Sequence, residues 1–400
     1  MSPITAPMVF TTVGLIVGTD ALGWFDLDLG GEEVSILVEA TLVLVLFTDA
    51  IRIDLRALRQ ESWVPVRLLG IGLPLSLVLG TLLAFVLLSD LTFVEAALVA
   101  AVLAPTDAAL GQAVVSDQRL PVRIRQGLNV ESGLNDGIVL PLVTVLLTIA
   151  AAEENSDGFA EWGEFLARQI GFGILSGLLI GGVGGFVLQK RSIAGAVEGL
   201  YQQLATIAVA VGAFAFAELL EGNGFIAAFV AGLAFGAVAP GQCEGIQDFT
   251  EDEGELLSVI TFTVFGAVLV GPFLDDLTWR VALYAVLSLT VVRMLPVLLA
   301  TMRSGTLVET RLFLGWFGPR GLASILFGLL VIEDVDGAGA DEIFLVVMWT
   351  VLLSVYAHGL TASPWVGRLS RRIAEGSDEM PERAPAMEMP TRRRFGDRDS

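Results

Sequence analysis

The chain has 400 residues, of which 54% are hydrophobic and 17% are charged, with a formal net charge of -21. Long apolar runs with few charges are typical of a membrane protein and exclude an ordinary water-soluble domain. A single cysteine, Cys243, and a single histidine, His358, exclude an intramolecular disulfide and any metal site that needs two histidines, and neither residue receives a predicted role.

A helix needs about 20 apolar residues to cross a hydrocarbon core of about 30 Å. By this rule the sequence predicts an all-α polytopic membrane protein with twelve spans. The spans are approximately residues 3–19, 34–50, 66–88, 93–115, 128–151, 164–188, 200–220, 225–239, 256–273, 279–302, 312–332 and 343–361. The first stretch lacks the basic start and the small-residue cleavage pattern of a signal peptide, so we count it as a span.

The connections between these spans alternate between basic and non-basic composition. Because Lys and Arg set membrane orientation while Asp and Glu contribute little, this alternation predicts both termini in the cytoplasm. The acidic loops at 20–33 and 153–161 are then outside. One internal loop, 240–255, is acidic instead of basic, which weakens the pattern there. We expect the polar segment 363–400 to be a disordered cytoplasmic tail.

The two halves of the chain resemble each other faintly, as in transporters built from inverted repeats. The matching features are Gly-x-x-x-Gly at 14–18 and 232–236, Pro74 and Pro296, and Pro- or Gly-containing interruptions at 104–107 and 318–321. This pairing predicts two broken crossing helices, the fourth and eleventh spans. It leaves the seventh span without a partner, so we expect that a helix before Met1 is absent from this chain. The alternative is a chance resemblance between glycine-rich helices.

Several ionisable side chains fall inside the predicted spans, where each costs about 3 kcal/mol or more without a partner or a function. At about 1.5 Å per helical residue, Asp107, Asp136, Arg293 and Arg320 come out roughly 12 to 14 Å from the cytoplasmic side. Glu131 lies nearer the inner face. Different helices therefore bring charge to one layer of the membrane, which is the predicted site of function.

Oxygen atoms concentrate at two of these positions. Asp107 follows Thr106 at the break in the fourth span, and Ser132 and Asp136 are four residues apart on one helix face. A hard cation such as Na⁺ prefers several oxygen ligands, which the two carboxylates, the Ser132 hydroxyl and the Thr106 carbonyl would supply. A proton can compete with the cation for the same carboxylates. The alternatives are that Asp107 only caps a kinked helix, and that Asn135 and Asp136 only hold helices together.

An unpaired arginine at this depth would be costly, so the sequence predicts a buried ion pair between Glu131 and Arg320. Arg293 is the alternative partner, or it contacts backbone carbonyls. Asp49, at the inner end of the second span, either lines the cytoplasmic entrance or is an ordinary interfacial acid, and the sequence favours neither.

At these residues the chain resembles the sodium/proton antiporters of the NhaP type, in the monovalent cation:proton antiporter-1 family. The matching segments are Leu-Phe-Thr-Asp at 46–49, Pro-Thr-Asp at 105–107, Glu-Ser-Gly-Leu-Asn-Asp at 131–136, 224–232 and Gly-Pro-Arg-Gly at 318–321. They extend over nearly the whole chain. The departures are Ala108 where the family usually has Pro, Asp49 where it often has Glu, and twelve predicted spans instead of thirteen.

The resemblance implies a homodimer in which a six-helix core moves against a dimerisation domain. The implied domains are dimerisation helices 1–65 and 200–277, core parts 66–151 and 278–362, and a linker helix at 152–199. Asp136 would be the main cation and proton carrier, Ser132 a ligand, and Asp107 and Thr106 part of the unwound crossing. Asn135, in place of a second Asp, goes with electroneutral exchange.

The predicted function is therefore an antiporter in a prokaryotic cell membrane that exchanges Na⁺, or else Li⁺ or K⁺, for H⁺. Membrane lipid and a second copy of the chain are the expected partners, with no cofactor and no nucleic acid. A K⁺/H⁺ exchanger, an electrogenic exchanger and a cation channel remain alternatives. An intramembrane enzyme is disfavoured, because the sequence offers one histidine and no nucleophile with a base in reach.

Overall fold

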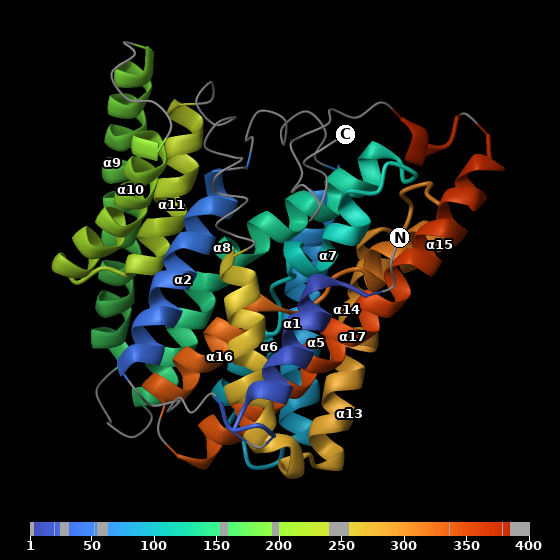
Figure 1. Cartoon of the computed structure of the whole chain (residues 1–400), viewed down its shortest axis with the longest axis horizontal. Helices are drawn as coiled ribbons and strands as arrows, with labels where there is room; N and C mark the ends of the chain where they lie inside the picture. Colours follow the sequence, from blue (N-terminus) through green and yellow to red (C-terminus); the bar gives the residue numbers. More distant parts are fainter. Residues whose placement is uncertain are drawn as a thin grey trace.

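The computed structural model describes residues 4–19, 21–24, 32–51, 53, 63–152, 159–193, 200–239, 256–335, 337–377 and 379–384. Over these ranges the chain folds into helices and connecting turns, without a β-strand element (Figure 1). The α-helices are α1 (Ala6–Val17), α2 (Glu32–Ile51), α4 (Trp63–Arg67), α5 (Leu73–Leu87), α6 (Phe93–Val102), α7 (Ala108–Val115), α8 (Val122–Ala152), α9 (Phe159–Ile193), α10 (Leu200–Leu219), α11 (Gly224–Val238), α13 (Trp279–Leu287), α14 (Arg293–Ala300), α15 (Val308–Trp316), α16 (Leu322–Asp334) and α17 (Ala338–Ala374).

The all-helical membrane architecture is confirmed. Within the described residues, seven helical stretches are long and apolar enough to cross a membrane, and α1, α6, α11 and most of α16 are shorter apolar helices. Each of the twelve predicted stretches contains helix, but the count of twelve crossings stays a prediction. The inner loop at 240–255 and residues 153–158 of an outer loop lie outside the described residues.

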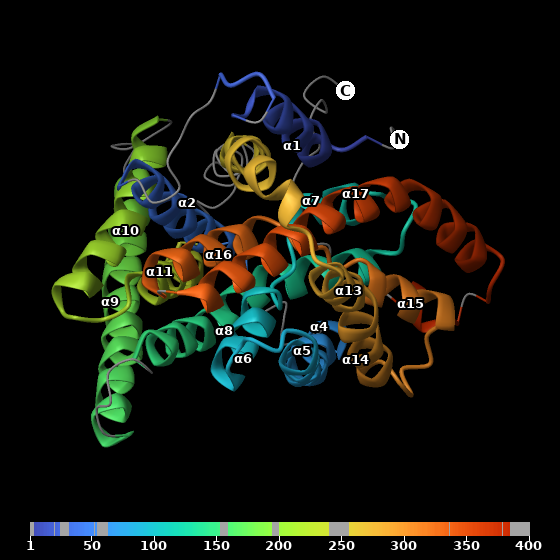
Figure 2. The same cartoon turned by 90° about the horizontal axis from the view of Figure 1, so that it is seen from below.

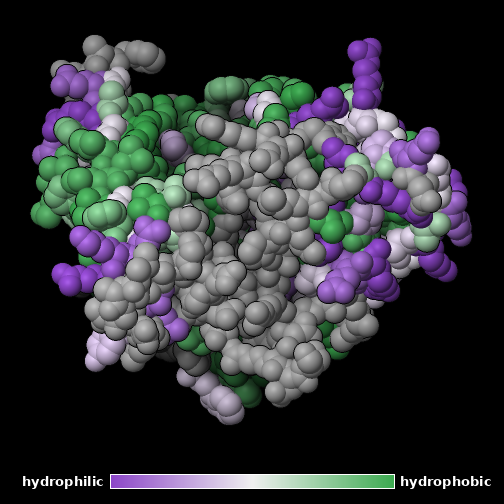
Figure 3. All heavy atoms as spheres, turned by 90° about the horizontal axis from the view of Figure 1, so that it is seen from above, coloured by the Kyte–Doolittle hydropathy of each residue, from purple (hydrophilic) through white to green (hydrophobic). Residues whose placement is uncertain are grey.

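The helices form two groups that meet along α8 and α16. In both views α9, α10 and α11 lie together at one end, whereas α13, α14, α15 and much of α17 lie at the other (Figures 1 and 2). Figure 3 shows a continuous hydrophobic area at the α9 to α11 end of one face. Exposed apolar side chains such as Leu178, Phe186 and Val211 contribute to this end of the molecule. Such a surface suits contact with lipid or with another apolar helix.

Glycines let α9 and α11 approach at backbone distance. A Cβ atom on Gly177 would lie 2.6 Å from the carbonyl oxygen of Ala227, and one on Gly181 would lie 2.3 Å from that of Ala231. Small residues at four-residue intervals are the usual means by which membrane helices pack closely, since apolar side chains gain little by leaving lipid. Larger residues at these positions would force the two helices apart.

The glycine pairs that suggested an internal repeat occupy equivalent interfaces. A Cβ on Gly14 would lie 2.1 Å from the carbonyl oxygen of Thr263, and one on Gly232 would lie 2.4 Å from that of Phe47. The first predicted span therefore packs on the ninth, and the eighth packs on the second. If the first span corresponds to the eighth and the second to the ninth, then the contact between the first and ninth spans corresponds to the contact between the eighth and second. Both contacts are present, so they support the repeat.

The third and tenth predicted spans share a second irregularity. Each contains a π-helical turn, at Leu68–Gly72 and at Ser288–Val292, and each has a proline shortly after it, Pro74 and Pro296. A π-turn inserts extra backbone into a helix, bends it, and occurs frequently at functional sites. Together with the two broken helices described below, these turns make the halves of the core structurally similar.

The prediction that residues 363–400 are disordered is wrong for the part that the structure describes. Helix α17 continues to Ala374, and a 3₁₀ turn follows at Pro381–Arg383. The Glu382 carboxylate is buried and accepts hydrogen bonds from the Leu307 N–H at 2.7 Å and the Thr310 hydroxyl at 2.9 Å. Leu307 precedes α15 and has no side-chain acceptor of its own, so Glu382 satisfies this helix end from a distance. Residues 385–400 lie outside the described residues.

Candidate ion-binding site

Two helices break and cross near the centre of the protein. The fourth predicted span consists of α6 and α7 with residues 103–107 between them, and the eleventh consists of α15 and α16 with residues 317–321 between them. The unwound segments are joined directly, because the Asp107 N–H donates to the Pro319 carbonyl at 2.8 Å. Unwound backbone inside a membrane protein is tolerated where protein surrounds it or where it lines a cavity.

The Asp107 carboxylate caps two helices at once. Its Oδ1 accepts the Leu110 N–H of α7 at 3.2 Å, and its Oδ2 accepts the Leu322 N–H of α16 at 2.6 Å. Helix N-termini carry partial positive charge and unpaired N–H groups, so both ends stabilise the carboxylate. Asp107 therefore caps both helices, and the same residue also lines a pocket described below, so its role as a cation ligand stays a prediction.

Both glycines of the Gly-Pro-Arg-Gly segment make room for charged side chains. A Cβ on Gly321 would lie 2.0 Å from Oδ2 of Asp107, and a Cβ on Gly318 would lie 2.4 Å from Nε of Arg293. Real Cβ contacts do not reach such distances, and the obstructing atoms belong to side chains that are themselves held by hydrogen bonds. The segment therefore needs glycine at both positions for steric reasons.

We expect Gly321→Ala to displace the Asp107 carboxylate and to lower cation-dependent transport by about tenfold to a hundredfold, because small displacements at a reacting site have effects of this size. The measurement is the initial rate of transport in proteoliposomes, normalised to the amount of folded protein. Gly182→Ala in α9 is the matched control, since nothing lies within 4 Å of its Cβ position. A wild-type rate in the Gly321 variant would contradict the steric argument.

Arg320 stabilises the other side of the crossing. Its guanidinium donates to the carbonyls of Ala104 at 2.6 Å and Pro105 at 3.1 Å, and the residue is only 1% exposed. The Ser324 hydroxyl donates to the Val102 carbonyl at 2.8 Å. The carbonyls of Ala104 and Pro105 lie just after the end of α6, where the helix dipole is negative, so a cation there is favourable. Arg320 thus holds the unwound segment that contains Thr106 and Asp107.

The predicted ion pair between Glu131 and Arg320 is wrong. Glu131 pairs with Arg293, which donates from Nη1 to Oε1 at 2.6 Å and from Nη2 to Oε2 at 2.8 Å. Both side chains are 3% exposed, and the two parallel bonds give the planar geometry that arginine and carboxylate favour. The two arginines lie at similar predicted depths, so depth alone does not decide which of them pairs with Glu131. The rotation of each helix about its axis decides it, and the partner is Arg293, the alternative given above.

Helix α8 brings two of the predicted site residues, Ser132 and Asn135, to Thr106. The Ser132 hydroxyl donates to the Thr106 carbonyl, and Nδ2 of Asn135 donates to the Thr106 hydroxyl at 2.6 Å. Asp136 is 5% exposed and follows Ser132 by about one turn. Because Thr106 is held through its backbone and its side chain, the unwound segment 103–107 lies at a defined distance from α8.

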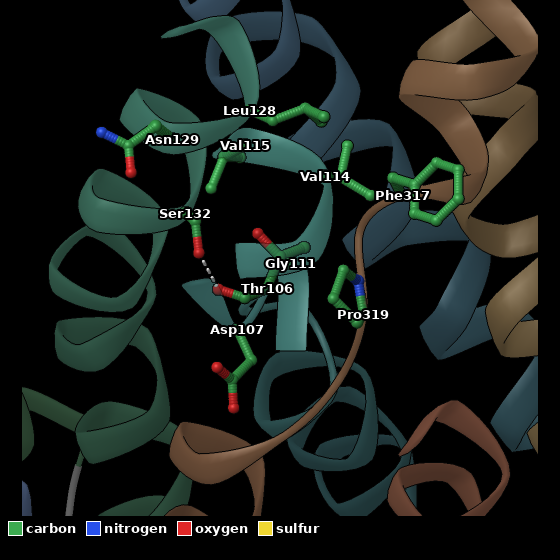
Figure 4. A pocket seen from close by; sticks show the side chains of 10 residues that line it. All are labelled: Thr106, Asp107, Gly111, Val114, Val115, Leu128, Asn129, Ser132, Phe317 and Pro319. Carbon is green, nitrogen blue, oxygen red and sulfur yellow. Dashed lines mark hydrogen bonds between the residues drawn. The ribbon is translucent and has the colours of Figure 1, made fainter. Parts of the chain in front are cut away.

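A pocket opens beside this contact (Figure 4). Figure 4 shows the Ser132 side chain directed at Thr106, whereas the Asp107 side chain next along the chain points away from Ser132. The lining residues are Thr106, Asp107, Gly111, Val114, Val115, Leu128, Asn129, Ser132, Phe317 and Pro319. Asp136, although close in the chain, is not among them. Asn129 was missed by the sequence argument, although its position three residues before Ser132 is a spacing that could have indicated the same helix face.

Asp49 lies next to the helix that carries Ser132. It is half-buried near the end of α2, and its carbonyl oxygen would be 3.9 Å from a Cβ on Gly133 of α8. This contact brings the second predicted span to the level of the pocket. Both interpretations of Asp49, as an entrance residue and as an interfacial acid, are compatible with this position.

The chemistry of the pocket fits an alkali cation as substrate. Its polar lining residues are Thr106, Asp107, Asn129 and Ser132, and its other lining residues include Phe317 and several aliphatic residues. Hard cations prefer oxygen ligands, whereas a transition metal would favour His or Cys. No cluster of three or more His, Cys, Asp or Glu residues suited to a metal ion occurs in the described part of the chain.

A comparison with protein families identifies the chain. The model of the transmembrane sodium/hydrogen exchanger matches residues 2–368. The chain belongs to the sodium/hydrogen exchanger family. The predicted resemblance to NhaP-type antiporters is confirmed by relatives that carry this name, as follows.

Among curated relatives of this chain, the K(+)/H(+) antiporter NhaP2 of Shewanella baltica is 25% identical over 362 residues, covering 88% of this chain and 60% of the relative. The K(+)/H(+) antiporter NhaP of Alkalimonas amylolytica is 26% identical, covering 91% of this chain and 62% of the relative. The Na(+)/H(+) antiporter of Saccharomyces cerevisiae is 26% identical, covering 82% of this chain and 35% of the relative. The chain therefore spans about 60% of the length of the bacterial relatives that it matches.

The fold matches a solved structure. The sodium proton antiporter MjNhaP1 from Methanocaldococcus jannaschii superposes with a TM-score of 0.75 and 22% sequence identity, covering 93% of this chain and 92% of that one. At this identity the match establishes a shared fold, while the substrate has to be argued from the site.

Proposed function

We propose that this chain is a secondary active antiporter that exchanges a monovalent cation, Na⁺ in the first place, for protons by alternating access. The observation that carries the proposal is the pocket at the crossing, which is lined by three residues with oxygen-bearing side chains, Asp107, Thr106 and Ser132. Asp136 does not line this pocket, but it is buried about one turn beyond Ser132 on α8, and the proposal includes it as the second carboxylate. Carboxylates that accept either a cation or a proton, exposed in turn to each side of the membrane, are sufficient for exchange.

K⁺ is the second candidate for the exchanged cation. The bacterial relatives that cover nearly the whole chain are named K⁺/H⁺ antiporters, whereas the solved structure and the yeast relative are named sodium or Na⁺/H⁺ antiporters. Carboxylate, hydroxyl and carbonyl oxygens accept both ions, so the donor atoms alone do not choose between them. Asn135, whose amide contacts Thr106, favours one-for-one electroneutral exchange because it adds no further carboxylate beside Asp136.

The test uses the purified protein in liposomes that enclose a pH-sensitive dye. We expect an outward proton gradient to be dissipated on addition of NaCl, with a smaller response to KCl and none to choline chloride. Clamping the membrane potential with valinomycin and K⁺ during Na⁺ addition should leave the rate unchanged if the exchange is electroneutral. Uptake of ²²Na⁺ without any coupled pH change would identify a channel and contradict the proposal.

The same proposal includes an assembly. In it, residues 1–65 and 200–277 form a dimerisation domain, and residues 66–151 and 278–362 form a core that moves against it, with 152–199 as the linker. The close packing of α9 and α11 and the hydrophobic area at this end support a surface for a second copy of the chain. The protein would lie in a prokaryotic cell membrane with its C-terminus in the cytoplasm. Crosslinking between cysteines introduced on α10 would test the dimer.

A further inference from the structure

Helix α17 contacts the second broken helix through three polar side chains about one turn apart. The Ser354 hydroxyl oxygen accepts a hydrogen bond from the backbone N–H of Arg320 at 2.7 Å. Nε2 of His358 lies 2.8 Å from the Trp316 carbonyl, and the Trp316 indole N–H donates to Thr361 at 2.9 Å. Trp316 is the last residue of α15, and Arg320 lies just before α16. Ser354, His358 and Thr361 therefore hold both flanks of the unwound segment 317–321.

His358 is held between the two flanks of the unwound segment. The residue is 1% exposed, and its ring stacks on Trp316 at 5.0 Å between centroids. Nε2 lies 2.8 Å from the Trp316 carbonyl, whereas Nδ1 lies 2.9 Å from the Ser354 carbonyl and 3.1 Å from the Ser354 hydroxyl. Both carbonyls can only accept, so a neutral ring donates to one of them, and the contacts alone do not select the tautomer. With either tautomer the ring contacts the end of α15 and the serine whose hydroxyl accepts the Arg320 backbone N–H.

His358 has a counterpart in the first repeat. If the fourth and eleventh spans correspond, then so do α8 and α17. On α8 the spacing is Ser132-x-x-x-Asp136, and on α17 it is Ser354-x-x-x-His358. Each serine bonds the residue that follows the proline of its own broken helix, Thr106 in the first repeat and Arg320 in the second. By spacing and contact, His358 occupies in the second repeat the place that Asp136 occupies in the first.

We propose that His358 is a positioning residue for the exchange reaction. It contacts the end of α15 directly and, through Ser354, Arg320 just before α16. The segment between these contacts supplies the Pro319 carbonyl, and the first residue of α16 supplies the Leu322 N–H, and both bond Asp107. The charged groups whose fields reach its ring are Arg320 and Arg293. The imidazole touches no substrate in this role and acts through the crossing. The proposal rests on the proposed antiport function.

The first test compares transport kinetics of His358→Ala and His358→Gln. We expect the alanine variant to raise the KM for the cation about tenfold, because Asp107 loses its fixed position. The glutamine variant keeps an N–H that can reach the Trp316 carbonyl and should stay within about threefold of wild type. Thr350→Ala is the matched control, since Thr350 is buried on the same helix but its hydroxyl bonds only the Val346 carbonyl of α17 itself.

The second test does not need transport. Hydrogen exchange of peptides covering residues 313–325 should be about tenfold faster in His358→Ala than in wild type or Thr350→Ala. If the alanine variant does not fold, Ser354→Ala should produce the same changes with a smaller loss of volume. If the wild-type protein shows no transport while peptides covering residues 313–325 exchange slowly, the antiport function is overturned, whereas the contact of His358 with the crossing is not. Unchanged KM and exchange in His358→Ala, equal changes in Thr350→Ala, or a glutamine variant as impaired as the alanine one would overturn the positioning role.

Discussion

Asp136→Asn is expected to reduce cation-driven proton flux to the level of protein-free liposomes while the folded protein remains in the membrane. Asparagine has nearly the shape of aspartate, so the packing around this 5% exposed side chain is preserved. It has no charge to attract a cation and cannot carry a proton at ordinary pH, so both substrates lose the group for which they compete. The measurement is dequenching of a pH-sensitive dye on addition of Na⁺, with size-exclusion chromatography as the check on folding.

Asp276→Asn is a suitable control for this prediction. Asp276 ends the 3₁₀ segment Gly271–Asp276, is exposed, and lies outside the pocket, so its substitution makes the same chemical change without touching the crossing. Its flux should equal that of wild type. Wild-type flux in the Asp136 variant would sink the mechanism, because exchange would then proceed without the carboxylate that we propose as the carrier.

Arg293→Ala is expected to destabilise the protein by about 3 to 5 kcal/mol, the cost of leaving one member of a buried ion pair without its partner. Glu131 would remain buried with a charge and without its two hydrogen bonds. Replacing both residues, as Arg293→Met with Glu131→Gln, should recover part of the loss, because no uncompensated charge remains. Thermal unfolding of the detergent-solubilised protein gives the comparison.

A surface ion pair provides the contrast. Arg168 and Glu221 also form an ion pair, but their side chains are 50% and 74% exposed, so Arg168→Ala should change stability by at most about 1 kcal/mol. If Arg293→Ala unfolds at the wild-type temperature, the burial argument fails. If Arg320→Ala, rather than Arg293→Ala, is the variant that Glu131→Gln rescues, then Arg320 is the energetic partner of Glu131 in spite of the geometry.

Much of the crossing could be predicted from the sequence because its signals are local. Proline and glycine within apolar runs indicate breaks, and the grouping of oxygen-bearing residues at one depth correctly placed Ser132 near Thr106. The four-residue interval between Ser132 and Asp136 predicts a shared helix face, but only Ser132 lines the pocket. Depth in the membrane follows from counting residues. These arguments need only a helix and a bilayer of known dimensions.

What could not be predicted depends on the direction in which a helix face points. Arg293 and Arg320 have similar predicted depths, so only the rotation of their helices decides that the first pairs with Glu131 and the second contacts the carbonyls after α6. The bond from Leu322 to Asp107 joins residues 215 positions apart, and no local pattern announces it. His358 was given no role because a single histidine in an apolar run has no spacing to interpret.

The contact of Glu382 with the start of α15 makes the chain after α17 a mechanical link to the crossing. A tension applied to the chain after residue 384 reaches Leu307 and Thr310 through one buried carboxylate, and α15 transmits it to Trp316 at the edge of the unwound segment. Fusion tags and truncations belong after residue 384 for this reason. A shortened chain that ends at 363, where the sequence suggested that the folded part stops, would lose the last turns of α17 and release the end of α15 as well.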